Sequence, residues 1–178
     1  MKRESGFTLL EVLIAMLVGS IGLLGTIAVQ QAIITASKNA NDAAIAMRLA
    51  SQKTEEIYSR SSDTQTADQL NGLGSLSSAP GGNPKWYPTD GTGARIPEYV
   101  DAGGISLRDA GGYPILPTQL TQPSDQANAF ARYRWRRQWK VANTGVGLPY
   151  VISVIVTYSN DVGDPKTTRL DIERRKGW

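Results

Sequence analysis

The sequence predicts an α+β protein in which one long N-terminal α-helix packs on a C-terminal antiparallel β-sheet. Two observations predict this order. The first 60 residues hold an apolar run followed by an amphipathic stretch, and residues 132–176 show strand-like alternation interrupted by turn sequences. Residues 61–131 contain ten of the 18 glycines and seven of the nine prolines, which predicts a long irregular connection between helix and sheet.

The apolar run covers residues 7–29 and contains one charge, Glu11. Its 23 residues would form about 34 Å of helix, enough to cross a bilayer core. Lys2 and Arg3 precede it, so the positive-inside tendency predicts a cytoplasmic N-terminus and export of the remainder. A cleaved secretory signal is a weaker interpretation, because the run is long and no small-residue cleavage site follows it. A plain signal anchor explains everything except the glutamate and the glycine–phenylalanine step before it.

The composition excludes several classes of function. The 178 residues have a formal net charge of +3, too mild to imply a polyanionic partner, and include no cysteine and no histidine. Disulfide frameworks, thiolate metal sites, zinc hydrolases and catalysis by Ser-His-Asp or Cys-His are therefore excluded. No constellation of carboxylates, lysine or tyrosine suggests another chemistry. We expect no enzymatic activity, no cofactor and no metal site.

The stretch GFTLLEVLIAMLV, residues 6–18, resembles the class III signal of type IV pilins and type II secretion pseudopilins. It has a short basic leader, then glycine, phenylalanine, a few apolar residues and glutamate. The resemblance implies that a prepilin peptidase cuts after Gly6 and that the new N-terminal residue, Phe7, is methylated. It also implies that the apolar helix stays on the mature chain, because the cut precedes it, and that the fold is the type IV pilin fold.

The resemblance gives Glu11 a role between subunits. In a fibre of staggered helices, its carboxylate would meet the amino group of Phe7 on a neighbouring subunit. Two unit charges about 4 Å apart attract by roughly 4 kcal/mol at an effective dielectric constant of about 20. The alternative is that Glu11 neutralises the amine of its own chain or reaches the membrane interface.

Glycines recur at every third position of the apolar helix, as Gly19, Gly22 and Gly25. Small residues let helices approach closely in lipid, and glycine also weakens a helix, so packing and local flexibility both remain open.

The second half of the helix is amphipathic, and we expect its alanine-rich face to pack on the chain's own sheet. That face steps by three and four residues: Ile33, Ala36, Ala40, Ala43, Met47, Ala50, Thr54 and Ile57.

Three strands are expected in the C-terminal part, RYRWRRQWKV, PYVISVIVTY and TTRLDIERR. Strict alternation puts one set of the first strand's side chains towards the core: Tyr133, Trp135, Arg137, Trp139 and Val141. The opposite set is mostly cationic: Arg132, Arg134, Arg136, Gln138 and Lys140. Asp171 and Glu173 of the third strand could pair with these cations. Asp161 and Asp164 lie in SNDVGDP, which we interpret as a hairpin turn rather than a calcium loop.

The candidate partner interface combines aromatic residues of the connection with the outer face of the arginine-rich strand: Trp86, Tyr87, Arg132, Arg134 and Arg136. Cations interleaved with aromatics are also typical of nucleic-acid binding. Alternation puts most of the aromatics into the core, so a solvated or protein-binding face is favoured and DNA uptake is the minority interpretation. We expect that replacing residues 75–112 by a Gly/Ser linker leaves the head folded.

The expected organisation is a leader (1–6), a helix (7–60, with 7–29 in the membrane or fibre core) and a head (61–178), itself divided into a variable loop (61–131) and a β-meander (132–176). The start of the chain, the long loop and the terminal strands resemble PilV-type minor pilins. Such proteins help prime pilus assembly and sit near the tip with other minor pilins and a PilY-type adhesin.

The resemblance also implies the other partners: the major pilin, the prepilin peptidase and the inner-membrane assembly platform. It implies a single-pass inner-membrane protein with a periplasmic head, which reaches the pilus and cell surface after assembly. The alternatives are a minor pseudopilin of type II secretion, a DNA-binding competence pilin and a signal-anchored periplasmic binding module.

Overall fold

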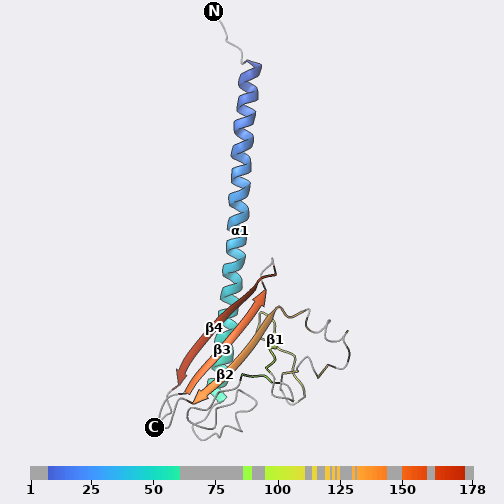
Figure 1. Ribbon diagram of the computed structural model, residues 1–178, viewed down its shortest axis with the longest axis vertical. Coiled ribbons are helices and arrows are strands. Elements are labelled where there is room, and N and C mark those ends of the chain that lie inside the picture. The colour runs from blue at the N-terminus through green and yellow to red at the C-terminus, as the bar shows by residue number, and fades with distance from the viewer. Residues whose placement is uncertain are drawn as a thin grey trace, which may run out of the picture. The chain divides into compact units, whose positions relative to one another are not determined.

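The computed structural model of the chain describes residues 8–60, 86–89, 95–110, 114–115, 119–120, 122, 124, 130, 132–143, 150–159 and 163–174. Over these residues the chain forms one long helix, α1 (Leu9–Arg60), and one four-stranded antiparallel sheet (Figure 1). The strands are β1 (Glu98–Val100), β2 (Trp135–Asn143), β3 (Tyr150–Ser159) and β4 (Pro165–Arg174). This confirms the predicted α+β class and matches the type IV pilin fold.

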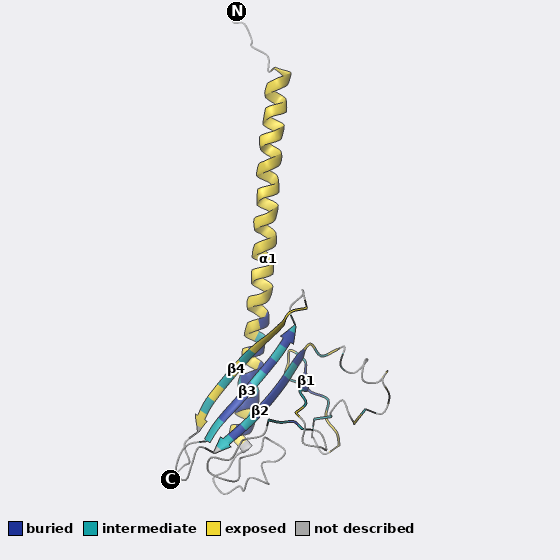
Figure 2. Ribbon diagram, in the orientation of Figure 1, coloured by how far each residue is buried: buried dark blue, intermediate teal, exposed yellow. Residues whose placement is uncertain are grey.

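The N-terminal part of α1 is exposed on every face within the chain. All residues from 8 to 41 are exposed, including the large apolar side chains (Figure 2). Of the described residues, α1 supplies the one helix long and apolar enough to cross a membrane, with a mean hydropathy of 2.5 in its most apolar window. An apolar helix surface of this kind requires a lipid or protein partner to cover it.

The helix runs without interruption through Gly19, Gly22 and Gly25. A methyl group added at any of the three would meet no atom within 4 Å. Within the described chain, no neighbouring atom requires glycine at these three positions. Close helix packing and local flexibility therefore both remain as interpretations.

The sheet has the strand order β1-β2-β3-β4, and every neighbouring pair is antiparallel. Strands β2, β3 and β4 form the predicted meander, and the β3–β4 connection includes Gly163 at a φ of +89°, a conformation that favours glycine. This fits the hairpin interpretation of SNDVGDP, although Asp161 itself lies outside the described residues.

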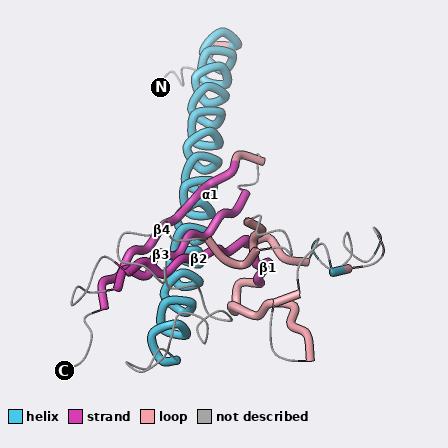
Figure 3. Tube along the Cα trace, turned by 60° about the horizontal axis from the view of Figure 1, so that its bottom comes forward, coloured by secondary structure: helices cyan, strands magenta, loops and turns pink. Residues whose placement is uncertain are grey.

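The core lies between one face of the sheet and the C-terminal part of α1, which the strands cross in Figure 3. Strand alternation supplies the sheet side as predicted, because successive side chains point to opposite faces. The buried apolar side chains are Ala46, Leu49, Ala50 and Ile57 of α1, and Val100, Trp135, Trp139, Val141, Ile152, Val154, Val156 and Tyr158 of the strands.

The buried face of α1 differs in part from the predicted one. Ala50, Thr54 and Ile57 are buried as expected, but Ala43 and Met47 are exposed. A true α-helix repeats every 3.6 residues, so a stripe drawn with a 3.5-residue step drifts around the helix. The face that packs on the sheet combines apolar and polar side chains. The apolar ones are Ala46, Leu49, Ala50 and Ile57, and the polar ones are Asp42, Lys53 and Thr54.

The glycine- and proline-rich connection contains a strand that the sequence analysis missed. Its strand β1 pairs with β2, and both Glu98 and Val100 are buried. The three-residue run EYV is too short to stand out beside so many glycines and prolines. The structure argues against the expectation that the head folds without residues 75–112, because this range contains β1.

A tight turn holds β1 in place. Gly103 and Ile105 donate backbone hydrogen bonds of 2.8 and 3.0 Å to the Asp101 carboxylate, and Arg48 of α1 donates one of 2.9 Å to the Ala102 carbonyl. Gly104 has a φ of +83°, which a side chain rarely adopts. The turn thus connects the end of β1 directly to the helix.

Candidate functional site

The first turn of α1 holds Glu11 against Thr8. The backbone N–H and the hydroxyl of Thr8 each donate a hydrogen bond of 3.1 Å to Glu11 Oε2. In return, the Glu11 N–H donates one of 3.3 Å to the Thr8 hydroxyl. This reciprocal pattern is a capping box, with threonine as the N-cap and glutamate three residues later. Glu11 therefore caps the helix of its own chain, a role that differs from both roles expected from the sequence.

The cleavage and methylation residues, Gly6 and Phe7, lie outside the described residues. The salt bridge between Glu11 and a neighbour's Phe7 accordingly stays a prediction. The carboxylate does lie at the N-terminal end of the helix, where the helix dipole favours a negative charge.

A group of charged side chains is buried between α1 and the sheet. Glu98 of β1 accepts a hydrogen bond of 3.0 Å from Arg137 Nε of β2, and its Oε2 lies 4.0 Å from Lys53 Nζ of α1. These three side chains are only 1–2% exposed. The same lysine contacts Glu56 at 3.1 Å and lies 3.8 Å from the ring centroid of Trp139.

The two cations keep Glu98 ionised. Burial alone would raise the pKa of its carboxyl, but the charges of Arg137 and Lys53 and the hydrogen bond from Arg137 outweigh burial, so the pKa lies below its ordinary value of 4.5. Arg137 also donates a hydrogen bond of 3.2 Å to the Leu49 carbonyl of α1. The cluster thus joins helix, connection and sheet, and it is sealed from solvent.

Sequence reasoning placed Arg137 on the core side of its strand, and the structure confirms this. A charge on a core face requires a buried partner. The buried arginine therefore predicted a buried carboxylate partner elsewhere in the chain. The alternation of β2 could not identify that partner as Glu98.

The candidate interface residues have different surroundings. Tyr87 exchanges two backbone hydrogen bonds with Trp139, at 2.7 and 3.0 Å, and packs on the core, so it extends the sheet rather than standing free. Arg134 forms a 2.6 Å ion pair with Asp42 of α1 and donates a 2.9 Å hydrogen bond to the Ser159 carbonyl. Its predicted place on the outer cationic face is therefore wrong, because this arginine precedes β2 and turns to the helix.

Trp86 and Arg136 do belong to the outer side of the sheet. The ring of Trp86 is contacted by Lys140 Nζ at 4.8 Å and by the guanidinium of Arg95 at 5.5 Å. Arg95 and Arg136 both line one pocket, so Trp86 lies beside this pocket through its contact with Arg95. Arg132 is exposed beside the start of β2.

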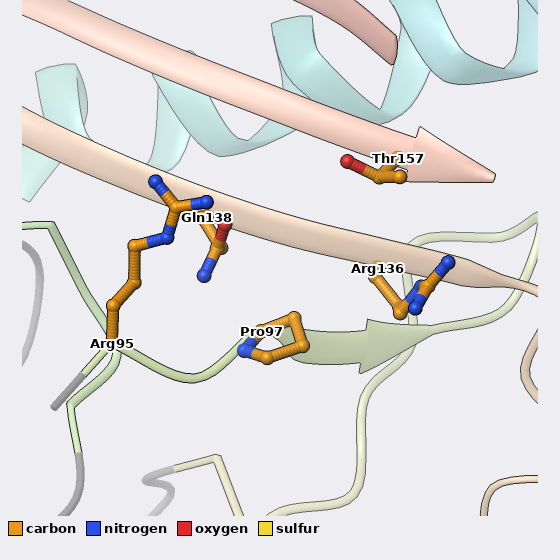
Figure 4. A pocket seen from close by; sticks show the side chains of 5 residues that line it. All are labelled: Arg95, Pro97, Arg136, Gln138 and Thr157. Atoms are coloured by element: carbon orange, nitrogen blue, oxygen red, sulfur yellow. The ribbon is translucent and has the colours of Figure 1, made fainter. Parts of the chain in front are cut away.

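The pocket has a volume of about 290 Å³ and is lined by Arg95, Pro97, Arg136, Gln138 and Thr157. Figure 4 shows the Arg95 side chain reaching from its loop towards β2, with Pro97 at the start of β1 and Thr157 on β3. Sequence reasoning missed Arg95 and Pro97, because they lie in the connection and no periodicity relates them to β2.

The expected pairing of β4 carboxylates with β2 cations is only indirect. Strand β3 lies between them, and Asp171 forms its ion pair with Arg169 of its own strand, at 2.8 Å. Burial raises the pKa of Asp171, but hydrogen bonds from Arg169 and Ser153 and the charges of Arg169 and Lys140 together lower it overall. Lys140, Ser153 and Asp171 form one row across the sheet, which explains this long-range effect.

The start of the chain matches a known protein family motif. The chain carries the prokaryotic N-terminal methylation motif over residues 1–27. This motif is the signal of type IV pilins and pseudopilins, and here it includes the capping box and continues into α1. Comparisons with curated proteins and with solved structures gave no match.

The motif and the helix together support membrane anchoring and methylation. They imply membrane-associated assembly with other pilins and processing by a prepilin peptidase.

Proposed function

We propose that the chain is a minor pilin of a type IV pilus, a structural subunit that helps to prime assembly. The observation that carries this proposal is the methylation motif at the start of a helix that continues without interruption into the sheet-bearing head. In such a design the helix supplies a common means of assembly and the head supplies subunit identity.

The proposal includes a PilV-type role near the tip, beside other minor pilins and a PilY-type adhesin. The support is the resemblance of the chain's start, together with the presence of Glu11. In the family, the tip-most component often lacks this glutamate, so a subunit that has it fits a place just below the end. The head would be periplasmic before assembly and exposed on the pilus afterwards.

The proposal assigns no catalytic role. The sequence offers neither histidine nor cysteine, and the described charge cluster is enclosed and internally compensated. Because Lys53, Glu98 and Arg137 are only 1–2% exposed, we assign this cluster to the fold.

Mass spectrometry of the native N-terminus tests the proposal. We expect the protein in purified fibres to begin at Phe7 and to carry one added methyl group. A Gly6→Leu variant should keep its leader and stay out of fibres, and a Ser5→Ala variant should be processed normally. Intact Met1 in assembled fibres would overturn the proposal.

A minor pseudopilin is the second candidate, because the same motif serves type II secretion. Deleting the gene separates the two. Loss of surface pili with normal protein secretion supports the pilus role, whereas loss of secretion with normal pili supports the pseudopilin role. The competence-pilin alternative predicts loss of DNA uptake in cells that still make pili.

A further inference from the structure

The face of the sheet opposite α1 bears a pocket bordered by positive charge. Arg95 approaches it from the connection and Arg136 from β2, and both line its wall (Figure 4). Lys140 extends the positive surface, since it shares the ring of Trp86 with Arg95. Among the described residues, no carboxylate lines the pocket or forms an ion pair with either arginine.

The remaining walls provide shape and hydrogen bonds. Gln138 is only 8% exposed, and its amide can both donate and accept at the pocket. Thr157 adds a hydroxyl, and Pro97 adds a rigid apolar wall. A planar guanidinium binds a carboxylate through two parallel hydrogen bonds, so this lining is complementary to a carboxylate.

We propose that this pocket binds the carboxylate side chain of an acidic peptide segment on a partner protein. The inference goes beyond the proposed function, because it concerns the head alone and does not depend on fibre assembly. Arg95 and Arg136 would clamp the carboxylate, Gln138 and Thr157 would orient it, and Trp86 would border the peptide backbone.

The charge on the rest of this face favours a short acidic segment over nucleic acid. Asp171 and Glu173 of β4 alternate onto the same face as Arg136 and Lys140, because their registers are linked through β3. Two strand spacings separate β4 from β2, about 10 Å, which is about one Debye length at physiological salt. Arg169 lies on the same face of β4 and pairs with Asp171, so a polyanion crossing the sheet would meet repulsion from Glu173, whereas a short segment confined to β1 and β2 would not.

Binding is measured with the full chain in nanodiscs of neutral phosphatidylcholine. The probe is the peptide acetyl-Gly-Ser-Glu-Thr-Glu-Ser-Gly-amide, and its counterpart with glutamine at both glutamates is the control. Tryptophan fluorescence reports binding, since Trp86 borders the site. We expect saturable binding of the acidic peptide and at least tenfold weaker binding of the control.

Variants locate the site. Arg95→Gln and Arg136→Gln should each weaken peptide binding about tenfold or more, because each removes a charge-assisted pair. Lys166→Gln removes an exposed cation from β4, away from the pocket, and should change binding less than about twofold. Circular dichroism confirms that each variant keeps its fold.

Three outcomes would overturn the inference. One is the absence of saturable peptide binding. A second is tighter, equally arginine-dependent binding of oligodeoxythymidine, which would make the pocket a nucleic-acid site. The third is complete displacement of the peptide by inorganic phosphate at low millimolar concentration, which would make it a general anion site. None of these changes the N-terminal mass, so failure here is distinct from failure of the pilin proposal.

Discussion

At the residue scale, Glu11 already has a hydrogen-bonding partner in its own first helical turn. Its capping box with Thr8 satisfies two donors at the start of α1. Removing Glu11 by alanine would therefore disturb the helix start and any contact between subunits at the same time. The two roles have to be separated before the carboxylate is assigned to the fibre.

Glutamine separates them, because it supports a capping box and carries no charge. We expect Glu11→Gln to insert into the membrane with an unchanged helix start, yet to enter fibres as poorly as Glu11→Ala. Quantitative immunoblotting of sheared pili measures incorporation. Normal incorporation of the glutamine variant would restrict Glu11 to capping, and Thr8→Val would then show the larger defect.

Glu98 is the second residue whose charge has large consequences. Replacing it by glutamine leaves Arg137 buried without its carboxylate and leaves Lys53 with Glu56 alone. Breaking a buried pair in this way costs about 3–5 kcal/mol. We expect Glu98→Gln to lower the free energy of unfolding of the full chain by that amount at neutral pH, measured by denaturant titration in detergent. The matched change Glu173→Gln, on an exposed position, should stay within about 0.5 kcal/mol.

The same pair predicts a dependence on pH. Because the pKa of Glu98 is below 4.5 in the folded state, its contribution is complete above 4.5 and is lost as the pH falls through the folded value. The stability difference between the wild type and Glu98→Gln should therefore be constant from pH 5 to 7 and shrink below about pH 4.5. Arg108 also lies near this carboxylate, 3.8 Å from Glu98 Oε1. A difference that persists unchanged to pH 2 would contradict the assignment.

At the scale of elements, the N-terminal part of α1 is long but contains residues that lower helix stability. Its three glycines lower helix stability, and a Cβ atom added at any of them would meet no neighbouring side chain within 4 Å. A helix so exposed can take alanine at these positions without a clash in the single subunit.

Gly22→Ala should accordingly stabilise the helix by about 1 kcal/mol. We expect amide hydrogen exchange around residue 22 to slow about fivefold in micelles. The reverse change Ala28→Gly should speed exchange by a similar factor. Reduced incorporation of Gly22→Ala into fibres would favour close packing at this glycine, and normal incorporation would leave neither packing nor flexibility necessary there.

Elements with regular periodicity were predictable, and elements defined by distant partners were not. The long apolar helix and the alternating strand with Trp135, Arg137 and Trp139 follow from local pattern alone. Strand β1 does not, because three residues carry no period and its stability comes from Glu98 meeting two cations far along the chain. The buried face of α1 was misjudged partly because a 3.5-residue step drifts around the helix, and partly because Lys53 becomes a core residue only beside that carboxylate. The pocket likewise could not be predicted from the sequence, because Arg95 and Arg136 are separated by 40 residues and meet only in the folded chain.

At the scale of the whole molecule, the connection between helix and sheet contributes to the fold as well as to the surface. Replacing residues 75–112 by a Gly/Ser linker removes Glu98 and Val100 and should prevent the head from accumulating. Replacing only 63–84 ends before Trp86 and keeps β1, so we expect that variant to accumulate. Protein levels by immunoblotting, with limited proteolysis of membranes, distinguish the two. Equal accumulation would show that β1 is dispensable.

The position of Glu98 between its two cations also has a consequence for the order in which parts of the head can fold. A chain that ends at residue 97 has Lys53 on the helix face that packs on the sheet, with Glu56 but without Glu98 to meet it. Glu98 and Arg137 follow over the next 40 residues, so the buried charges can pair only once residue 137 is present. A nick in the connection that releases β1 would reopen the structure by leaving two cations in its interior. We therefore expect chains that lack Glu98 or Arg137 to be cut by proteases more readily than the intact chain.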